Sequence, residues 1–344
     1  MPVQYEPFNT SQDVTTTKTL LHEVIPITGS IVSGTYADGN IKNYSHGMFQ
    51  SVYDYPYLSS SANHIFDLTV GYDEASGLSG STSIQNSKKI NLYNQYAQVL
   101  LGYTGSASNV RKFENDLLND GTGAMKEVFF INFSRLITKD QVKKGSFALS
   151  LGTGSVFADP FNDADLVLQD SRASERTGFQ TEQGGDYGLL FTSSAATATD
   201  IAVGNIFYQA GIAIITASVF GSSVLVDSAG HNIQAVLTGS SISGACDAIR
   251  HRVNNLTFNN TTEINSKIYF CRVPHNKFNY SQNPTYTSNG QVVVKTIETD
   301  NPISYITTIG LYSSTGELLA TAKLSEPLRK DPTNELTLRV RLDY

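Results

Sequence analysis

The amino-acid sequence predicts a mainly β protein, with antiparallel, β-sandwich-like sheets, a few short helices and an extended N-terminal arm. Runs rich in β-branched and aromatic residues recur along the chain, separated by clusters of Gly, Asn, Asp and Ser. The last ten residues, ELTLRVRLDY, alternate strictly between apolar and polar side chains, as in a strand with one buried face. Only three segments carry the signals of a helix.

The chain is predicted to have three parts. Residues 1–60 are rich in Thr, Ser, Tyr and Pro with weak periodicity, and are expected to form an extended arm with lead-in strands. Residues 61–260 are expected to form a β-rich domain, and residues 261–344 a C-terminal antiparallel sheet region. A chain of 344 residues accommodates one large or two smaller β domains, so the last region is either continuous with the domain before it or separate.

The clearest helix is predicted over residues 87–102. Ser87 is placed to cap its N-terminus, because a serine hydroxyl accepts a backbone N–H there. Apolar residues from Ile90 to Leu101 recur at spacings of three and four, and Gly102 can adopt the left-handed conformation that ends a helix.

Two further helices are predicted. Thr138 and Gln141 have the spacing of a capping box and indicate a short helix. The other covers residues 240–253, where apolar side chains align on one face. Cys246 lies on that face and is expected to be a core thiol.

The remaining segments are expected to be strands and turns. In the C-terminal region, YITTIGLY is apolar on both faces and is expected at the centre of one antiparallel sheet, with Pro327 and Pro332 in a loop. Asn289-Gly290 predicts a tight hairpin turn, because Asn-Gly supplies the positive φ angles that such turns need. Other strands are predicted over residues 126–137, 146–151, 187–191, 205–220 and 263–273.

Composition excludes several classes of function. The net charge of −7 argues against a protein whose main task is to neutralise nucleic-acid phosphates. The longest apolar run, residues 211–220, has about half of the roughly 20 residues that cross a bilayer. The first residues lack the features of a secretory signal, so export is not expected. The two cysteines, Cys246 and Cys271, indicate no disulfide framework.

The low content of charge also suggests what the surface contacts. Charged residues make up 16% of the chain, against about 25% in typical soluble domains. Ser, Thr, Asn, Gly and Tyr are plentiful instead. The surface of a solitary monomer is usually more charged, so this composition predicts a surface that other subunits cover.

No motif predicts an active site, and we expect no enzyme activity, no cofactor and no metal. The six histidines are scattered, without the HxH or HExxH spacing that places two imidazoles on one ion. The segment DPFNDADL, residues 159–166, could aim acidic side chains at calcium, but it lacks the glycine and distal glutamate of an EF-hand, so a surface turn is favoured. The glycine turns lack the Lys-Ser or Lys-Thr of a phosphate-binding loop, and no GxSxG elbow occurs.

Five residues form the candidate interface. Tyr53, Tyr55 and Tyr57 alternate in sequence and are predicted to share one strand face, where tyrosines suit a protein interface or a sugar platform. Core or edge packing explains these tyrosines equally well. Arg339 and Arg341 lie on the polar face of the last strand, where they select an acidic neighbour or simply face water.

A resemblance to bacteriophage proteins comes from the C-terminal region. The strand ITTIGLY, the turn SSTG and the strand ELLATAKL resemble a hairpin that recurs in tail fibre, collar and baseplate proteins of tailed phages. More loosely, KKGSFALSLGTGS, NNTTEINSKIYFC, HNKFNYSQNPTYTSN and LRVRLDY are similar to virion proteins of large contractile-tailed phages. The resemblance implies a tail, baseplate or collar setting and carries over no site residue. Fibre shafts are disfavoured, because they follow this hairpin with repeats that are missing here.

These observations predict a non-enzymatic virion structural protein that assembles in multiple copies in a phage tail, baseplate or neck. Its expected partners are other virion proteins and copies of itself, with no specific nucleic acid and no membrane. Two alternatives are a capsid decoration or vertex protein and a tail-tip receptor or glycan-binding protein. The expected location is the virion, after synthesis in the host cytoplasm.

Overall fold

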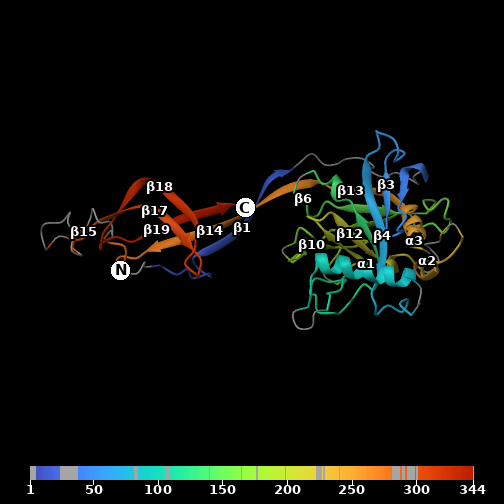
Figure 1. Cartoon of the computed structure of the whole chain (residues 1–344), viewed down its shortest axis with the longest axis horizontal. Coiled ribbons are helices and arrows are strands. Elements are labelled where there is room, and N and C mark those ends of the chain that lie inside the picture. The colour runs from blue at the N-terminus through green and yellow to red at the C-terminus, as the bar shows by residue number, and fades with distance from the viewer. Residues whose placement is uncertain are drawn as a thin grey trace. The chain divides into compact units, whose positions relative to one another are not determined.

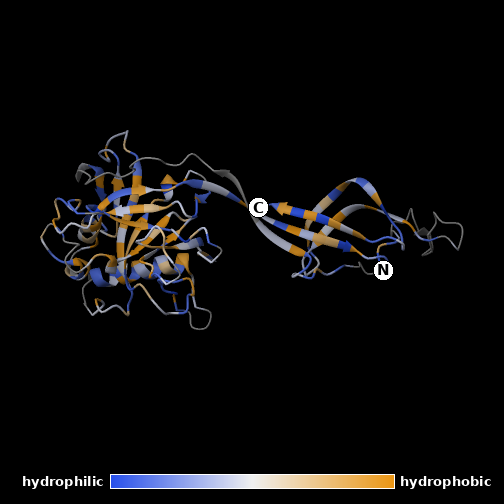
Figure 2. Cartoon of the chain, turned by 180° about the vertical axis from the view of Figure 1, so that it is seen from behind, coloured by the Kyte–Doolittle hydropathy of each residue, from blue (hydrophilic) through white to orange (hydrophobic). Residues whose placement is uncertain are grey.

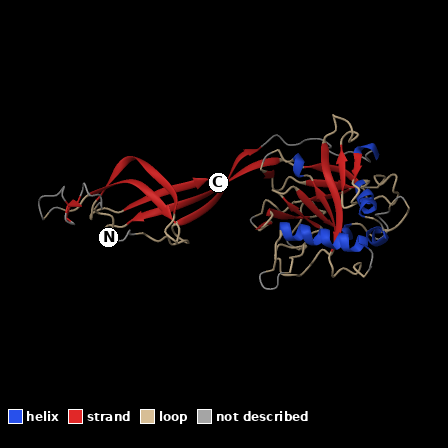
Figure 3. Ribbon diagram, viewed as in Figure 1, coloured by secondary structure: helices blue, strands red, loops and turns tan. Residues whose placement is uncertain are grey.

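The chain forms two compact units. The computed structural model describes residues 5–23, 38–80, 84–104, 109–138, 140–163, 165–175, 177–197, 199–221, 227, 229–239, 241–280, 287–288, 291–292, 299 and 301–343. Unit 1 comprises Met1–Leu20 and Ile264–Tyr344, and unit 2 comprises Leu21–Glu263. Most of the described elements are antiparallel strands, which confirms the predicted fold class (Figures 1 and 3).

The division between the two units lies near the predicted boundary at residue 261, whereas residues 1–60 are divided between both units. Residues 1–60 do not form one segment, because β1 (Val14–Glu23) pairs with β14 (Asn260–Val273) near the other end of the chain. The Phe270 N–H donates to the Asp13 carbonyl at 2.8 Å beside this pairing. The strands between residues 41 and 53 belong instead to the main sheet of unit 2. Pairing between distant segments therefore overrides the weak local pattern.

Unit 2 is built on an eight-stranded antiparallel sheet. Its strand order is β2-β3-β4-β5-β12-β11-β10-β9. In that order the strands are β2 (Ile41–Asn43), β3 (Gln50–Tyr53), β4 (His64–Tyr72), β5 (Glu127–Asn132), β12 (Ile212–Thr216), β11 (Gly204–Phe207), β10 (Gly185–Leu190) and β9 (Phe179–Glu182).

A second layer covers one face of this sheet, and a helix covers the other. The second layer contains a three-stranded sheet of order β13-β7-β8 together with two helices. The elements are β13 (Val253–Thr257), β7 (Ala148–Leu151), β8 (Leu166–Gln169), α2 (Ile233–Gly239) and α3 (Ile242–Arg250), and the helix on the opposite face is α1 (Ile84–Leu100).

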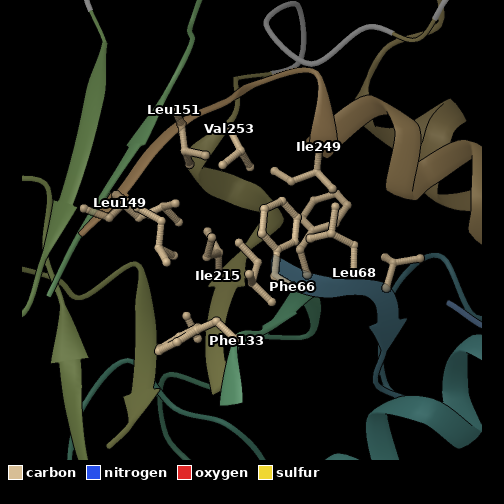
Figure 4. Packing of buried hydrophobic residues seen from close by; sticks show 14 of the residues in the cluster. Phe66, Leu68, Phe133, Leu149, Leu151, Ile215, Ile249 and Val253 are labelled. Carbon is tan, nitrogen blue, oxygen red and sulfur yellow. The ribbon is translucent and has the colours of Figure 1, made fainter. Parts of the chain in front are cut away.

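Both faces of the eight-stranded sheet are apolar. On β5, Phe129 and Ile131 belong to the cluster shared with the second layer, whereas Val128 and Phe130 belong to the cluster under α1. Figure 4 shows the first cluster, with Phe66 of β4 facing side chains from β7, β13 and α3. Unit 2 thus has a three-layer arrangement with its core on both sides of one sheet.

Helix α1 packs closely on β4 through Gly71. A Cβ atom added at Gly71 would lie 2.9 Å from both the Lys89 carbonyl oxygen and the Tyr93 nitrogen. Gly102 has a φ of 83° and ends the helix as predicted. Ser87, however, is not the N-cap, because α1 begins one turn earlier at Ile84. Contacts within unit 2 hold that first turn, where the Tyr72 hydroxyl donates to Asn86.

Helix α3 confirms the third predicted helix within a few residues of each end. The Ser241 hydroxyl accepts the Gly244 N–H at 3.1 Å as its N-cap. Cys246 is fully buried, as the sequence predicted. The short α2 was not predicted; its Leu237 carbonyl accepts a hydrogen bond from the buried Lys89.

The helix predicted from Thr138 and Gln141 does not form. Gln141–Val142 is instead strand β6, which pairs with Asn260 and Thr261 at the start of β14. The predicted strand over residues 205–220 is two strands, β11 and β12, joined by a hairpin. In both segments long-range pairing decides the conformation.

Unit 1 contains strands and no helix in its described residues. β14 pairs with β19 (Leu336–Asp343), and β17 (Ser304–Tyr312) pairs only with β18 (Leu318–Lys330) as a separate two-stranded ribbon. The short β15 (Thr287–Ser288) and β16 (Gln291–Val292) also pair with each other, and the turn predicted at Asn289-Gly290 between them lies outside the described residues.

Two expectations for the C-terminal region are therefore wrong. YITTIGLY is not at the centre of one sheet, because β19 pairs with β14 and not with the ribbon. Pro327 is not in a loop but within β18, where the pairing shifts register opposite Ile306 and Thr308. The alternation along β19 is as predicted: Val340 is buried, and Arg339 and Arg341 are exposed.

Gly71→Ala should destabilise unit 2, because the added methyl group meets the backbone of α1. We expect the free energy of unfolding to fall by about 1–3 kcal/mol, the usual cost of overpacking. Chemical denaturation followed by circular dichroism measures this change. Gly77→Ala is the matched control, because a Cβ there meets nothing within 4 Å. An equal loss in both variants would contradict the proposed close contact.

A candidate assembly surface in unit 1

Unit 1 lacks a hydrophobic core in its described residues. Only three of its hydrophobic side chains are buried there, Val273, Leu311 and Val340, each at 7–8% exposure. The three hydrophobic clusters of the described chain contain residues of unit 2 alone. The strands of unit 1 alternate between hydrophilic and hydrophobic residues, so they carry an apolar face (Figure 2). Among the described residues, no hydrophobic cluster forms on that face.

Polar contacts anchor the ribbon of β17 and β18 instead. Lys330 is fully buried, and its Nζ donates to Asn279 Oδ1 at 2.6 Å, to the Asp331 carbonyl at 2.7 Å and to the His275 carbonyl at 3.2 Å. These bonds tie the end of β18 to the turn that follows β14. Three acceptors around one ammonium group satisfy all of its donors.

The same turn contains a strained residue. Phe278 has a φ of 60°, a conformation that is unusual for a bulky side chain. The Ser304 hydroxyl, at the start of β17, donates to the Phe278 carbonyl at 2.5 Å. Strained residues persist where their surroundings hold them and often mark functional sites.

A groove runs through unit 1 beside the ribbon. Its volume is about 1040 Å³. One wall is β17 and the turn after it, from Ser304 to Gly316, and the opposite wall includes Phe270–Val273 of β14 and Leu338 of β19. Tyr5–Phe8 and Phe278 also line it. We call this space the groove.

The charged groups of the groove are already paired. Arg272 donates to Asp13 at 2.6 Å, and Lys277 donates to Glu6 at 2.6 Å. The remaining lining is mostly aromatic, aliphatic, Ser and Thr. The groove therefore suits an uncharged, partly apolar occupant.

Large apolar side chains are exposed around the ribbon. Tyr305 is 62% exposed and Leu319 is 68% exposed. Tyr5, Tyr280, Tyr312 and Leu318 are exposed as well. One sequence feature indicates this surface: YITTIGLY is apolar on both faces and contains no charged residue.

The three predicted interface tyrosines lie in unit 2 and do not share a strand face. β3 ends at Tyr53, and Tyr55 and Tyr57 lie in the loop that follows. Tyr55 is 60% exposed, and the rings of Tyr53 and Tyr57 lie 6.3 Å apart. Tyr53 and Tyr57 form an aromatic pair at the end of β3, and the strand stops before the alternation can continue to Tyr55.

Arg339 and Arg341 lie in unit 1, on the exposed face of β19. Arg341 donates to Asp343 at 2.7 Å and to Ser266 at 3.0 Å, so its charge has a partner. Arg339 makes no side-chain hydrogen bond or ion pair within the described structure. It is thus the more available of the two for an acidic neighbour.

An acidic cluster in unit 2 was not predicted. Carboxylate oxygens of Glu114, Asp116 and Asp120 lie within 4.8 Å of one another, and such oxygens suit hard cations. The N–H groups of Asp120 and Gly121 donate to Glu114 at 3.1 and 2.8 Å. Burial raises the pKa of Glu114. The acidic side chains of DPFNDADL do not form such a cluster among the described residues.

A buried polar cluster in unit 2 contains a carboxyl group with a shifted pKa. Burial raises the pKa of Asp170 to about 7, although the N–H groups of Gly145 and Phe147 and the Tyr208 hydroxyl donate to it. Nearby, Lys144 binds Asp186 at 2.8 Å. A shifted pKa can mark an active site. However, Asp170 is 1% exposed and Tyr208 is fully buried, so a substrate does not reach them in this conformation.

Lys330→Met should loosen the ribbon, because it leaves three acceptors, two of them in the buried residues Asn279 and Asp331, without their donor. We expect the free energy of local opening of β17 and β18 to fall by about 2–4 kcal/mol. Native-state hydrogen exchange of peptides from residues 304–330 measures it. Lys323→Met, at an exposed position of β18, should have little effect. Equal exchange in both variants would rule out Lys330 as the anchor.

Asp170 should make the stability of unit 2 depend on pH. Its folded-state pKa is raised, so its stabilising contribution is complete below about pH 4, declines as pH rises and is lost above about pH 7. The expected slope between pH 5 and 7 is at most about 1.4 kcal/mol per pH unit. Denaturation curves of the wild type and Asp170→Asn over this pH range isolate the contribution of Asp170 to the free energy of unfolding. Parallel pH profiles for the two proteins would contradict it.

Comparison with known proteins identifies no relative of this chain. No protein-family model, curated protein or solved structure matches the chain. Among its described helices, none is long and apolar enough to span a membrane. The proposals below therefore depend on the residues and contacts of this chain and on the resemblance of its C-terminal hairpin.

Proposed function

We propose that the chain is a non-enzymatic structural subunit of a phage particle, present in multiple copies in the tail, baseplate or neck. The observation that carries this proposal is the lack of a hydrophobic cluster among the described residues of unit 1, because a unit of this size needs apolar burial to be stable. Contacts with other subunits supply that burial. Many obligate subunits are stable only in their assembly.

The phage setting is supported by the hairpin in residues 302–324. The ribbon of β17 and β18 is the structural counterpart of the resembling segment, and it forms one wall of the groove. The residue that closes its turn, Gly316, has a φ of 86°, so the turn has the left-handed geometry that this sequence favours. We therefore place the protein in the virion, where its partners are other virion proteins and copies of itself.

A tail-tip receptor or glycan-binding role is the second candidate. The exposed Tyr55 and Tyr57, near the end of β3, favour it, because aromatic rings offer flat apolar surfaces for sugars. A glycan array is the direct comparison: specific hits that vanish in Tyr55→Ala would favour this role. A capsid decoration or vertex role differs only in location, and electron microscopy of labelled particles separates head from tail.

Reversing the charges of Arg339 and Arg341 tests a contact with an acidic neighbour. In Arg339→Glu, Arg341→Glu, two carboxylates replace the guanidinium groups on the exposed face of β19. We expect the number of copies per particle to fall by about tenfold or more, because like charges repel across an interface. Quantitative mass spectrometry of purified particles measures the copy number.

The matched control changes the net charge equally at another surface. Lys126→Glu, Arg135→Glu reverses two exposed charges in unit 2 and should leave incorporation unchanged. Equal copy numbers for both double variants would exclude Arg339 and Arg341 from the interface. Complete absence of the wild-type chain from particles would exclude the proposed function itself.

A further inference from the structure

The free edges of the strands in unit 1 differ in how they are protected. Charged residues and prolines on an edge strand discourage pairing with another chain. β18 contains Lys323, Glu326 and Pro327, and β19 contains Arg339 and Arg341. β17, SYITTIGLY, contains no charge and no proline over nine residues. Among the described strands it pairs only with β18, so its other edge is available.

The available edge of β17 lies along the groove. Every residue from Ser304 to Tyr312 lines it. A strand that enters the groove can therefore pair with the N–H and C=O groups of β17 and cover apolar side chains at the same time. This is strand addition at a sheet edge, in which main-chain hydrogen bonds supply affinity and side-chain pockets supply specificity.

We infer that the occupant is β17 of a second copy, paired antiparallel about its midpoint, Thr308. This inference rests on the proposed function, since it names the partner of the same surface. The pairing gives a four-stranded sheet of order β18-β17-β17-β18 across two copies. The pairing is isologous: Ile306 of each copy faces Gly310 of the other, and Thr308 of one copy faces Thr308 of the other.

The charge of unit 1 favours a second copy. Residues 1–20 and 264–344 contain ten Lys and Arg and nine Asp and Glu, a net charge of +1, whereas residues 21–263 carry a net charge of −8. Two nearly neutral surfaces approach without the repulsion that two strongly charged ones meet. The internal pairs Arg272–Asp13 and Lys277–Glu6 also leave the groove without a demand for a charged ligand.

The exposed apolar area around the ribbon is of the same order as the area that a stable protein interface buries. Tyr5, Tyr280, Tyr305 and Tyr312 are each between 43% and 62% exposed, and Leu318 and Leu319 are more than half exposed. With roughly 200 Å² per tyrosine, these six side chains offer on the order of 500 Å². A stable interface buries about 800 Å² per partner. The backbone of β17 and the exposed side chains of Thr307 and Thr308 provide the remainder.

Opposite charges introduced at Thr308 test the symmetry directly. Thr308 is exposed and lies opposite Lys323 of β18 in its own chain, so both variants are made in a Lys323→Met background that removes this neighbouring charge. In a paired β17, two copies of Thr308→Lys, or two of Thr308→Glu, place like charges face to face. We expect each variant alone to raise the dissociation constant for self-association by at least about tenfold. An equimolar mixture of the two should restore association. Sedimentation equilibrium of the full chain measures all three.

Two further variants complete the experiment. Thr337→Lys adds the same charge to an exposed position of β19 and should associate like the wild type. Thr308→Cys in a Cys271→Ser background should form a disulfide between copies under mild oxidation, because a residue on the two-fold axis lies opposite itself. This second readout does not depend on added charge.

The other outcomes of these experiments distinguish failure of the β17 pairing from failure of the proposed function. The pairing of β17 with itself is overturned if Thr308→Lys self-associates as tightly as the wild type. It is also overturned if both Thr308 variants are monomeric and their equimolar mixture does not associate. A wild-type chain that is monomeric in solution yet present in many copies in particles overturns the second copy as occupant and leaves the proposed function intact. A chain that is monomeric and absent from particles overturns both.

Discussion

A β-sheet must cover its apolar face, and the two units of this chain meet that requirement in different ways. Unit 2 covers both faces of its eight-stranded sheet with its own elements, α1 on one side and the three-stranded sheet with α2 and α3 on the other. Unit 1 has longer strands, such as β14 with 14 residues and β18 with 13, yet only three hydrophobic side chains are buried among its described residues. Hydrophobic burial is the main favourable term in folding, and this difference between the units is the physical basis of our proposal that unit 1 assembles with another surface.

Hydrogen bonds set the geometry of unit 1 without replacing its core. A single intramolecular hydrogen bond contributes only about 0.5–1.5 kcal/mol net, but its direction is well defined. Lys330 and Ser304 use such bonds to fix the base of the ribbon against the turn at Phe278. The groove is thereby held open in a defined shape before anything occupies it. Preorganisation of this kind lowers the entropic cost of association.

The sequence predicted those features that depend on local pattern. The alternation of β19, the glycine at the end of α1 and the apolar face of α3 follow from side-chain periodicity and backbone conformation, and all three are present. Features that depend on distant partners were missed. Gln141 is in a strand because Thr261 pairs with it, and residues 14–20 leave the predicted arm because β14 offers them an edge. Local propensity is a weak prior wherever tertiary pairing competes with it.

The same reasoning explains why the candidate site was only partly foreseen. The five predicted interface residues were chosen for their chemistry, and they lie on two separate units. The groove needs the juxtaposition of β17 with β14, which are more than thirty residues apart in sequence and are not paired with each other. A pattern within one segment carries no information about such a neighbour. The sequence of β17, SYITTIGLY, did indicate an uncharged strand with apolar residues on both faces.

Selective protection of edges decides whether an assembly closes or grows. An exposed strand edge that accepts any partner leads to open-ended aggregation. Here β1, β18 and β19 each contain charged residues that discourage pairing at an edge, and the uncharged β17 is the edge that we propose for association. Because a two-fold pairing of β17 with itself uses that edge in both copies, no accepting edge remains on either β17 and the contact closes. Contacts between such dimers and other subunits must then use other surfaces, such as the one around Arg339 on β19. Dimer formation and the incorporation of dimers into a larger assembly therefore use different surfaces.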